Sequence, residues 1–319
     1  MMNILLTAVF GLTKLQNKQL MLISFMKLFE DLIPSKSALV HLRFFFSFFL
    51  MPVFLFALSQ APQVITFNTI LTFIIWHALV YPASNGYNSY FDKDEGSIAL
   101  VEKPPQVDRT LYNFSLLLDA LGLVLAFFVS VELVAAVLLY GIFSKLYSHP
   151  STRLKKYPII SFLIVFVFQG ACIYWSSYAA ISGLSILSGW NANFIIAGLI
   201  CSCLIGATYP LTQVYQHEED GKRGDKTLSM VLGIKGSFVF SAVLFGIATV
   251  LLFLYWDSLQ KLLNFWLFLP FALPVFAVFI NWVRKVWQDE RAANYENMSK
   301  MTLVSGALML LYFGILNLI

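Results

Sequence analysis

Apolar residues run along this chain in long stretches that short polar segments interrupt. A helix needs about 20 apolar residues to cross the hydrocarbon core of a membrane. Stretches that meet or approach this length lie near 43–60, 64–87, 112–130, 132–147, 158–180, 193–214, 236–256, 262–283 and 301–319. The boundary between the third and the fourth is the weakest, because only Ser130 and Glu132 mark a turn there. The pattern predicts an all-α polytopic membrane protein with about nine transmembrane helices.

The composition supports this fold class. Of the 319 residues, 59% are hydrophobic and 12% are charged, whereas a soluble domain is about half apolar and about a quarter charged. So few charged side chains cannot cover a water-exposed globule, and this class of protein is excluded. We expect an N-terminal cytoplasmic or interfacial segment over residues 1–38, followed by a nine-helix membrane domain over residues 39–319.

The charges indicate partners and orientation. A net charge of +4 is too small to indicate nucleic acid, so we expect the lipid bilayer and no nucleic acid as a partner. With a cytoplasmic N-terminus, 20 of the 21 Lys and Arg residues fall on the cytoplasmic side, and only Lys261 falls outside. Basic residues collect on that side in membrane proteins. The sequence therefore predicts an integral, multi-pass protein with its N-terminus in the cytoplasm and its C-terminus outside, in a bacterial inner membrane.

Two acidic clusters lie on this side, in residues 85–96 after the second span and in residues 209–227 after the sixth. Amides and carboxylates recur within each cluster at spacings of three and four, which places them on one face if the helices continue. The residues are Asn85, Asn88, Asp92 and Glu95 in the first cluster, and Gln213, Gln216 and Asp220 in the second. We expect both clusters to face the same site.

The clusters have the chemistry of a metal site. Carboxylates at a helix C-terminus oppose the helix dipole, so two clusters that face each other need a cation. Oxygen ligands of this kind suit Mg²⁺, which typically takes one or two carboxylates and fills its other positions with water and substrate phosphates. Nearby basic residues are candidates for the remaining phosphate oxygens: Lys93, Lys155, Lys222, Arg223 and Lys226. The alternative is that both clusters are solvated loop charges, and the matched pair favours the functional interpretation.

At these residues the sequence resembles the UbiA-type intramembrane prenyltransferases from about Leu39 to the C-terminus. Their first motif, NDxxDxxxD or NDYFDxDxD, matches Asn88, Asp92 and Asp94, while Ser89 and Gly96 replace two of its aspartates. Their second motif is a DxxxD run followed by Gly-x-x-Thr. Here Asp220 matches its last carboxylate, Gln216 replaces the first, and Gly224 and Thr227 follow.

The resemblance implies a UbiA-like helical bundle and an enzyme. Its expected reaction is the Mg²⁺-dependent transfer of a prenyl group from a polyprenyl diphosphate to a lipophilic acceptor, with an aromatic one expected, at the cytoplasmic face. The implied catalytic residues are Asn88, Asp92, Gln216 and Asp220. The implied metal ligands are Asp92, Asp94 and Glu95 for one ion, and Glu218, Glu219 and Asp220 for another. The residues expected to bind the diphosphate are Arg153, Lys155, Lys222 and Arg223.

Two other functions remain open at this point. A secondary transporter would suit the similar polar ends of the second and sixth spans, but transport sites usually lie near the bilayer midplane. A non-catalytic member of the same fold would suit the departures at Ser89, Gly96 and Gln216. The acceptor also remains open among quinone-precursor aromatics, other phenols, haem, chlorophyll-like macrocycles and glycerolipids, as do the prenyl chain length and the oligomeric state.

Overall fold

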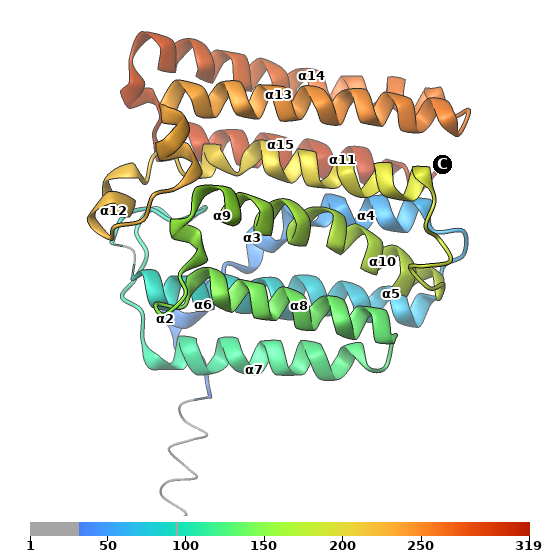
Figure 1. Ribbon diagram of the computed structural model, residues 1–319, viewed down its shortest axis with the longest axis horizontal. Helices are drawn as coiled ribbons and strands as arrows, with labels where there is room; N and C mark the ends of the chain where they lie inside the picture. The colour runs from blue at the N-terminus through green and yellow to red at the C-terminus, as the bar shows by residue number, and fades with distance from the viewer. Residues whose placement is uncertain (1–31, 94) are drawn as a thin grey trace, which may run out of the picture.

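The computed structural model describes residues 32–93 and 95–319, which form a bundle of long helices lying side by side (Figure 1). Within these residues no β-strand forms, and the one bridge joins Ile98 to Val101. The helices are α2 (Lys36–Leu42), α3 (Phe44–Phe48), α4 (Met51–Gln60), α5 (Thr66–Phe73), α6 (Tyr81–Asp92), α7 (Arg109–Ala126), α8 (Val131–Ser148), α9 (Pro158–Val165), α10 (Cys172–Ser182), α11 (Ala192–Thr208), α12 (His217–Lys222), α13 (Leu228–Ser258), α14 (Leu262–Gln288) and α15 (Tyr295–Ile315).

The prediction of about nine membrane spans is confirmed. Nine helical segments in the described part of the chain are long and apolar enough to cross a membrane. Each overlaps one predicted stretch, and the limits differ by several residues: the first begins at Lys36 and the last begins at Tyr295. Of the expected N-terminal segment, residues 1–31 lie outside the described residues.

Side-chain caps determine where several spans begin. The weakest predicted boundary is real, because α7 ends at Ala126 and the Ser130 side chain accepts a hydrogen bond from Leu133 N at the start of α8 (3.1 Å). Asp108 caps α7 in the same way through Leu111 N (3.2 Å). Such caps satisfy backbone N–H groups that have no partner inside the helix.

Two spans contain a π-helical segment. Residues Ile74–Val80 join α5 to α6, and Phe166–Ala171 join α9 to α10. The first ends two residues before Pro82, which has no N–H for the carbonyl four residues earlier, inside the segment, and so disturbs the regular ladder. In the second, Ser202 of α11 accepts a hydrogen bond from Ala171 N (2.9 Å). Each π-helical segment therefore lies where a neighbouring residue explains the irregular backbone.

Gly170 lies where α11 approaches the second π-helical segment most closely. A Cβ at this position would lie 2.4 Å from Ser202 Cα and 2.6 Å from Ser202 N, so the backbones would have to separate. We expect Gly170→Ala to lower the free energy of unfolding by about 1–3 kcal/mol, as overpacking typically does. Thermal unfolding of the purified protein measures this. Gly141→Ala is the matched control, because no atom lies within 4 Å of a Cβ there, and equal stability of the two variants would contradict the prediction.

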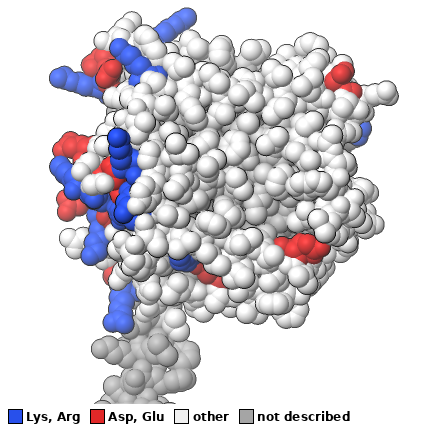
Figure 2. Space-filling view, in the orientation of Figure 1, with Lys and Arg blue, Asp and Glu red and all other residues white. Residues whose placement is uncertain are grey.

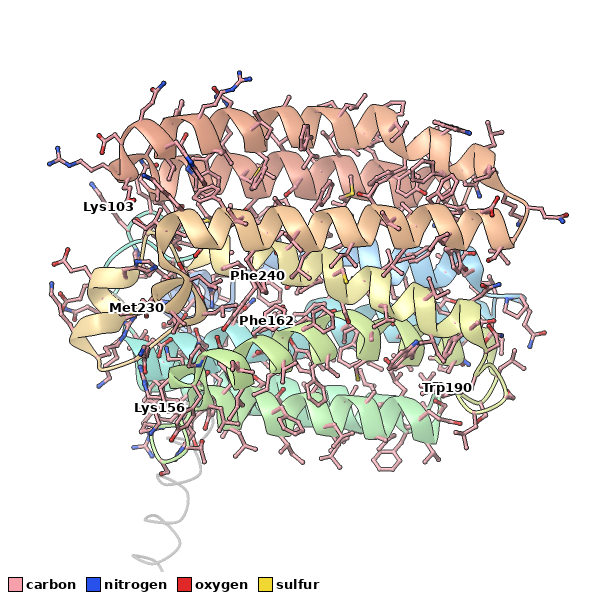
Figure 3. The ribbon with its side chains drawn as sticks, turned by 45° about the horizontal axis from the view of Figure 1, so that its top comes forward. Lys103, Lys156, Phe162, Trp190, Met230 and Phe240 are labelled. Atoms are coloured by element: carbon pink, nitrogen blue, oxygen red, sulfur yellow. The ribbon has the colours of Figure 1, made fainter. Side chains whose placement is uncertain are left out.

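The charged residues gather at one end of the bundle, beside α2 and α12 (Figure 2). Lys103 and Lys156 lie at this end, and Trp190 lies at the other (Figure 3). Between the ends, the helices pack through aromatic rings, as where Phe162 of α9 meets Phe240 of α13 with ring centroids 5.3 Å apart. Most of the charged side chains therefore lie at one end of the bundle, which we call the charged end.

Candidate active site

A cavity of about 230 Å³ opens at the charged end, and we call it the polar cavity. Its walls come from α6, α8, α9, α12 and the connections on either side of α12. Six of the residues expected from the sequence line it: Asn88, Asp92, Lys155, Gln216, Asp220 and Arg223. Residues from three distant parts of the chain therefore converge on one site.

The other expected residues take different positions. Glu95 is exposed, and Glu218 pairs with Lys222 on the outer surface of α12 (2.7 Å), where the Glu218 side chain is 83% exposed. Arg153 and Glu219 do not line the polar cavity but contact residues close to it. Asp94 lies outside the described residues.

The assumption that both helices continue through the acidic clusters is wrong. Helix α6 ends at Asp92, and Lys93 follows in the left-handed conformation (φ 50°), so Glu95 lies beyond the helix. Helix α11 ends at Thr208, because Pro210 cannot donate to the carbonyl four residues earlier. Gln213 and Gln216 consequently lie in the connection to α12, on which Asp220 lies. They reach the same cavity through this turn rather than along one helical face.

Four charged residues form a compact network at the cavity wall. Lys155 Nζ contacts Asp92 Oδ1 at 2.5 Å, and Arg153 Nη2 lies 3.5 Å from the same oxygen. Arg153 also binds Asp225 with two parallel hydrogen bonds, Nε to Oδ1 at 2.6 Å and Nη2 to Oδ2 at 2.7 Å. Lys155 Nζ lies 3.7 Å from Asp225 Oδ2. We call Asp92, Arg153, Lys155 and Asp225 the charge network.

Sequence reasoning missed Asp225. Its side chain is 1% exposed, which is unusual for an acidic residue unless it is paired. In the sequence it is one more charge in a polar loop, 72 residues from Arg153. No spacing rule connects two loops that are so far apart.

Arg223 links the two acidic segments. Its Nη2 donates to Asp220 Oδ1 (3.0 Å), and its Nη1 donates to the backbone carbonyl of Asp92 (3.3 Å). Burial raises the pKa of the Asp220 carboxyl, and the hydrogen bond from Arg223 offsets part of this effect. The hydrogen bonds that Arg153 donates to Asp225 raise the pKa of Arg153. Arg153 is therefore held in its charged form.

Residues 95–108 connect α6 to α7, and we call this segment the strap; its residues Ile98 and Ala99 line the polar cavity. Its first part is held by α12 and the residue before it, since Glu219 Oε1 accepts from Gly96 N (2.7 Å) and Gln216 Nε2 donates to Ser97 O (3.4 Å). Ile98 is buried and lines the cavity. A Cβ at position 96 would lie 2.5 Å from Glu219 Oε1. With Gly96 in place of the motif's last aspartate, the Glu219 carboxylate therefore has room in this position.

A second cavity, of about 460 Å³, lies between α4, α11, α13, α14 and α15, and we call it the apolar cavity. Its wall consists almost entirely of apolar side chains, with a few hydroxyl groups such as Ser241 and Thr302. Phe46 and Thr212 line both cavities. A ligand with a charged head and a long apolar tail would match this pair of adjoining cavities.

The donor set of the polar cavity fits Mg²⁺. Two carboxylates, Asp92 and Asp220, line it together with the amides of Asn88, Gln213 and Gln216. Among the described residues, no three His, Cys, Asp or Glu side chains converge closely enough to enclose an ion. Mg²⁺ commonly binds to one or two carboxylates and fills its remaining positions with water and substrate phosphates. A metal that arrives with a phosphate ligand would suit these residues.

A family model for the UbiA prenyltransferase family matches residues 49–306. The chain belongs to this family. Membership agrees with an integral, multi-pass membrane protein and confirms the resemblance seen in the motifs. Digeranylgeranylglyceryl phosphate synthase of Thermococcus gammatolerans is 30% identical over 187 residues, which is 57% of this chain and 63% of that relative. The match therefore spans less than two thirds of the relative's length.

Solved structures of UbiA homologues share the fold. One from Archaeoglobus fulgidus, bound to DMAPP and Mg²⁺, gives a TM-score of 0.66 at 17% identity and covers 89% of this chain and 100% of that chain. Another from Aeropyrum pernix, without ligand, gives a TM-score of 0.62 at 16% identity and covers 86% of this chain and 96% of that chain. The expected UbiA-like helical bundle is confirmed.

Proposed function

We propose that this UbiA-family protein transfers a prenyl group from a polyprenyl diphosphate to a lipophilic acceptor, with Mg²⁺ as cofactor. The observation that supports this most directly is the pairing of the two cavities. The polar cavity presents Asp92, Asp220, Lys155 and Arg223, and the apolar cavity adjoins it at Phe46 and Thr212. A diphosphate head would bind in the first, and its prenyl tail would extend into the second.

In this proposal Asp92 and Asp220 are the metal carboxylates, supported by Asn88 and Gln216. Bound Mg²⁺ would neutralise charge on the diphosphate as it leaves. Asp94 is a further candidate ligand from its place in the motif. Glu95 and Glu218 are not assigned to the metal, because the first is exposed and the second pairs with Lys222 at the surface.

The chain's own residues support an ionising substitution. The allylic C–O bond breaks and its electron pair leaves with the diphosphate, while a nucleophilic atom of the acceptor bonds to the prenyl carbon and loses a proton. Lys155, Arg223 and nearby Arg153 would hold the phosphate oxygens. The rings of Tyr147 and Tyr209 line the polar cavity, with hydroxyl oxygens 3.0 Å apart, and would stabilise the allylic cation. Ile98 of the strap would exclude water.

The reaction would take place at the cytoplasmic face. The distribution of Lys and Arg supports a cytoplasmic N-terminus and an external C-terminus, and the polar cavity lies at the charged end. A transporter is not favoured, because the carboxylates of both clusters lie at this end rather than near the middle of the bundle. Among the acceptors left open, the name of the Thermococcus relative favours screening glycerol phosphate lipids beside the aromatic compounds.

Binding of a labelled polyprenyl diphosphate to the detergent-purified protein tests the proposal without knowledge of the acceptor. We expect binding with Mg²⁺ and its loss with EDTA, followed by diphosphate release when an acceptor is supplied. A series of prenyl chain lengths extends the test to the apolar cavity. Absence of binding at every chain length would contradict the proposed function and favour transport assays in vesicles.

The apolar cavity should set which prenyl chains are used. Gly246 lines this cavity, and no atom lies within 4 Å of a Cβ built on it. Gly246→Trp should therefore fill space without disturbing the helices and should reduce kcat/KM for a 20-carbon diphosphate by about tenfold or more, the cost of a few unburied methylene groups. We expect little change for a 5-carbon substrate.

Gly141→Trp is the matched control for this variant. Gly141 also has open space around its Cβ position but lines neither cavity. An equal loss for long and short substrates in Gly246→Trp, or the same selectivity change in Gly141→Trp, would contradict the assignment of the apolar cavity to the prenyl tail.

A further inference from the structure

Asp225 is a buried acidic residue that neither sequence motif includes. It lies in the loop between α12 and α13, after Gly224 in the left-handed conformation (φ 77°). Both of its carboxylate oxygens accept hydrogen bonds from Arg153, at 2.6 Å and 2.7 Å. This two-point contact fixes the guanidinium plane as well as its position.

The contacts of Asp225 distinguish it from a metal ligand. Its side chain is 1% exposed and does not line the polar cavity. Each oxygen already has a short contact to Arg153, and Oδ2 also lies 3.7 Å from Lys155 Nζ. Asp92, by contrast, lines the cavity and contacts the same two cations from the cavity side.

The conformation of Arg153 depends on a contact with a residue outside its own loop. Its backbone is left-handed (φ 40°), which is uncommon for a residue with a side chain. The loop between α8 and α9 that contains it is anchored to the α12–α13 loop through Asp225. Without this carboxylate, Arg153 and Lys155 would both turn to Asp92, which is the nearest remaining carboxylate of the charge network.

We propose that Asp225 is a positioning residue for the diphosphate site. Its carboxylate binds Arg153 and Lys155 on the side away from the polar cavity, so that their cationic groups stay oriented toward the cavity when Asp92 binds a metal. This inference rests on the proposed function. It assigns the diphosphate affinity of this chain partly to a residue that would touch neither the substrate nor the metal.

The test is a double-mutant cycle on Asp225 and Arg153, read as binding of a non-hydrolysable prenyl thiolodiphosphate in the presence of Mg²⁺. We expect Asp225→Asn to weaken binding by about tenfold or more, the contribution of one charge-assisted hydrogen bond. At saturating substrate, kcat should change much less than KM, because the reacting groups are intact. In the Arg153→Met background, Asp225→Asn should cause no further loss, since Asp225 acts through Arg153.

Three measurements complete the design. Asp225→Glu keeps the charge and should restore most of the affinity, and the exposed Asp257→Asn, at the opposite end of the bundle, should bind as the wild type does. If Asp225→Asn does not fold, Arg153→Lys provides the same test, because Lys keeps the charge but cannot make the two-point contact. We then expect the tenfold loss in Arg153→Lys.

The outcomes separate this inference from the proposed function. Absence of diphosphate binding by the wild-type protein contradicts both. Normal binding by the wild type together with unchanged affinity in Asp225→Asn contradicts the positioning role alone. Additive losses in the double mutant, or a large fall in kcat together with weaker Mg²⁺ binding, also overturn it, because they would make Asp225 an independent ligand.

Discussion

Replacing Asp92 with Asn is expected to lower prenyl transfer by about 10³-fold or more. Asp92 is the one carboxylate that both lines the polar cavity and belongs to the charge network. Asn keeps its size and shape but removes the negative charge that would bind Mg²⁺, and a bound metal contributes several kcal/mol to such a reaction. Turnover of a polyprenyl diphosphate, measured as released diphosphate, tests this directly.

The same substitution should leave the protein folded. Breaking a buried ion pair typically costs about 3–5 kcal/mol, because the partner charge is left without compensation. Here Lys155 retains Asp225 at 3.7 Å, so we expect a smaller loss of stability. Thermal unfolding and circular dichroism of the variant check this point. Retained turnover in Asp92→Asn would contradict the metal assignment, whereas an unfolded variant would show that Asp92 is mainly structural.

Asp220→Asn is expected to have a similar effect on activity, and α12 provides its own control. Asp220 is buried, lines the polar cavity and is held by Arg223. Glu218 lies on the same helix, but its side chain is 83% exposed and pairs with Lys222. We expect Asp220→Asn to reduce turnover by about 10³-fold and Glu218→Gln to leave it unchanged. Comparable losses in both variants would mean that the charge of α12 as a whole, rather than one ligand, supports the reaction.

The pH profile gives a second readout for Asp220. Burial raises its pKa above the usual value for Asp. The carboxylate must be ionised to bind a metal, so activity should fall with decreasing pH at a higher pH than an ordinary Asp would cause. Added Mg²⁺ should move this acid limb to lower pH, because the metal competes with the proton for the same oxygens.

The sequence was sufficient for the membrane bundle and for the end at which its polar chemistry lies. Long apolar stretches identify spans with little ambiguity, because every backbone polar group in a membrane must be satisfied within the helix. The prediction from the sequence was wrong about where two of the helices end. Lys93 takes a left-handed conformation at the end of α6, and Pro210 ends α11, so neither acidic cluster is a continuous helical face. The prediction of one shared site nevertheless agrees with the polar cavity, because the turns after both helices lead to it.

Contacts between loops were beyond the reach of sequence patterns. Periodicity relates residues three or four apart on one helix, whereas the pair formed by Arg153 and Asp225 joins two connecting loops. The function of Glu219 was also hidden. Its carboxylate looks like a metal ligand in the sequence, but in the structure it accepts a hydrogen bond from the backbone of Gly96. Only the geometry of the strap reveals this contact.

The contact between Gly96 and Glu219 has an evolutionary consequence. The family motif has an aspartate at position 96. Its Cβ would lie 2.5 Å from Glu219 Oε1, and its carboxylate would add a second negative charge beside Glu219. The Glu219 carboxylate would have to move away from position 96. Alignments of close relatives should therefore show positions 96 and 219 changing together, with glycine at the first wherever glutamate occupies the second. The departure from the motif at Gly96 would then be linked to the residue at position 219 rather than independent of it.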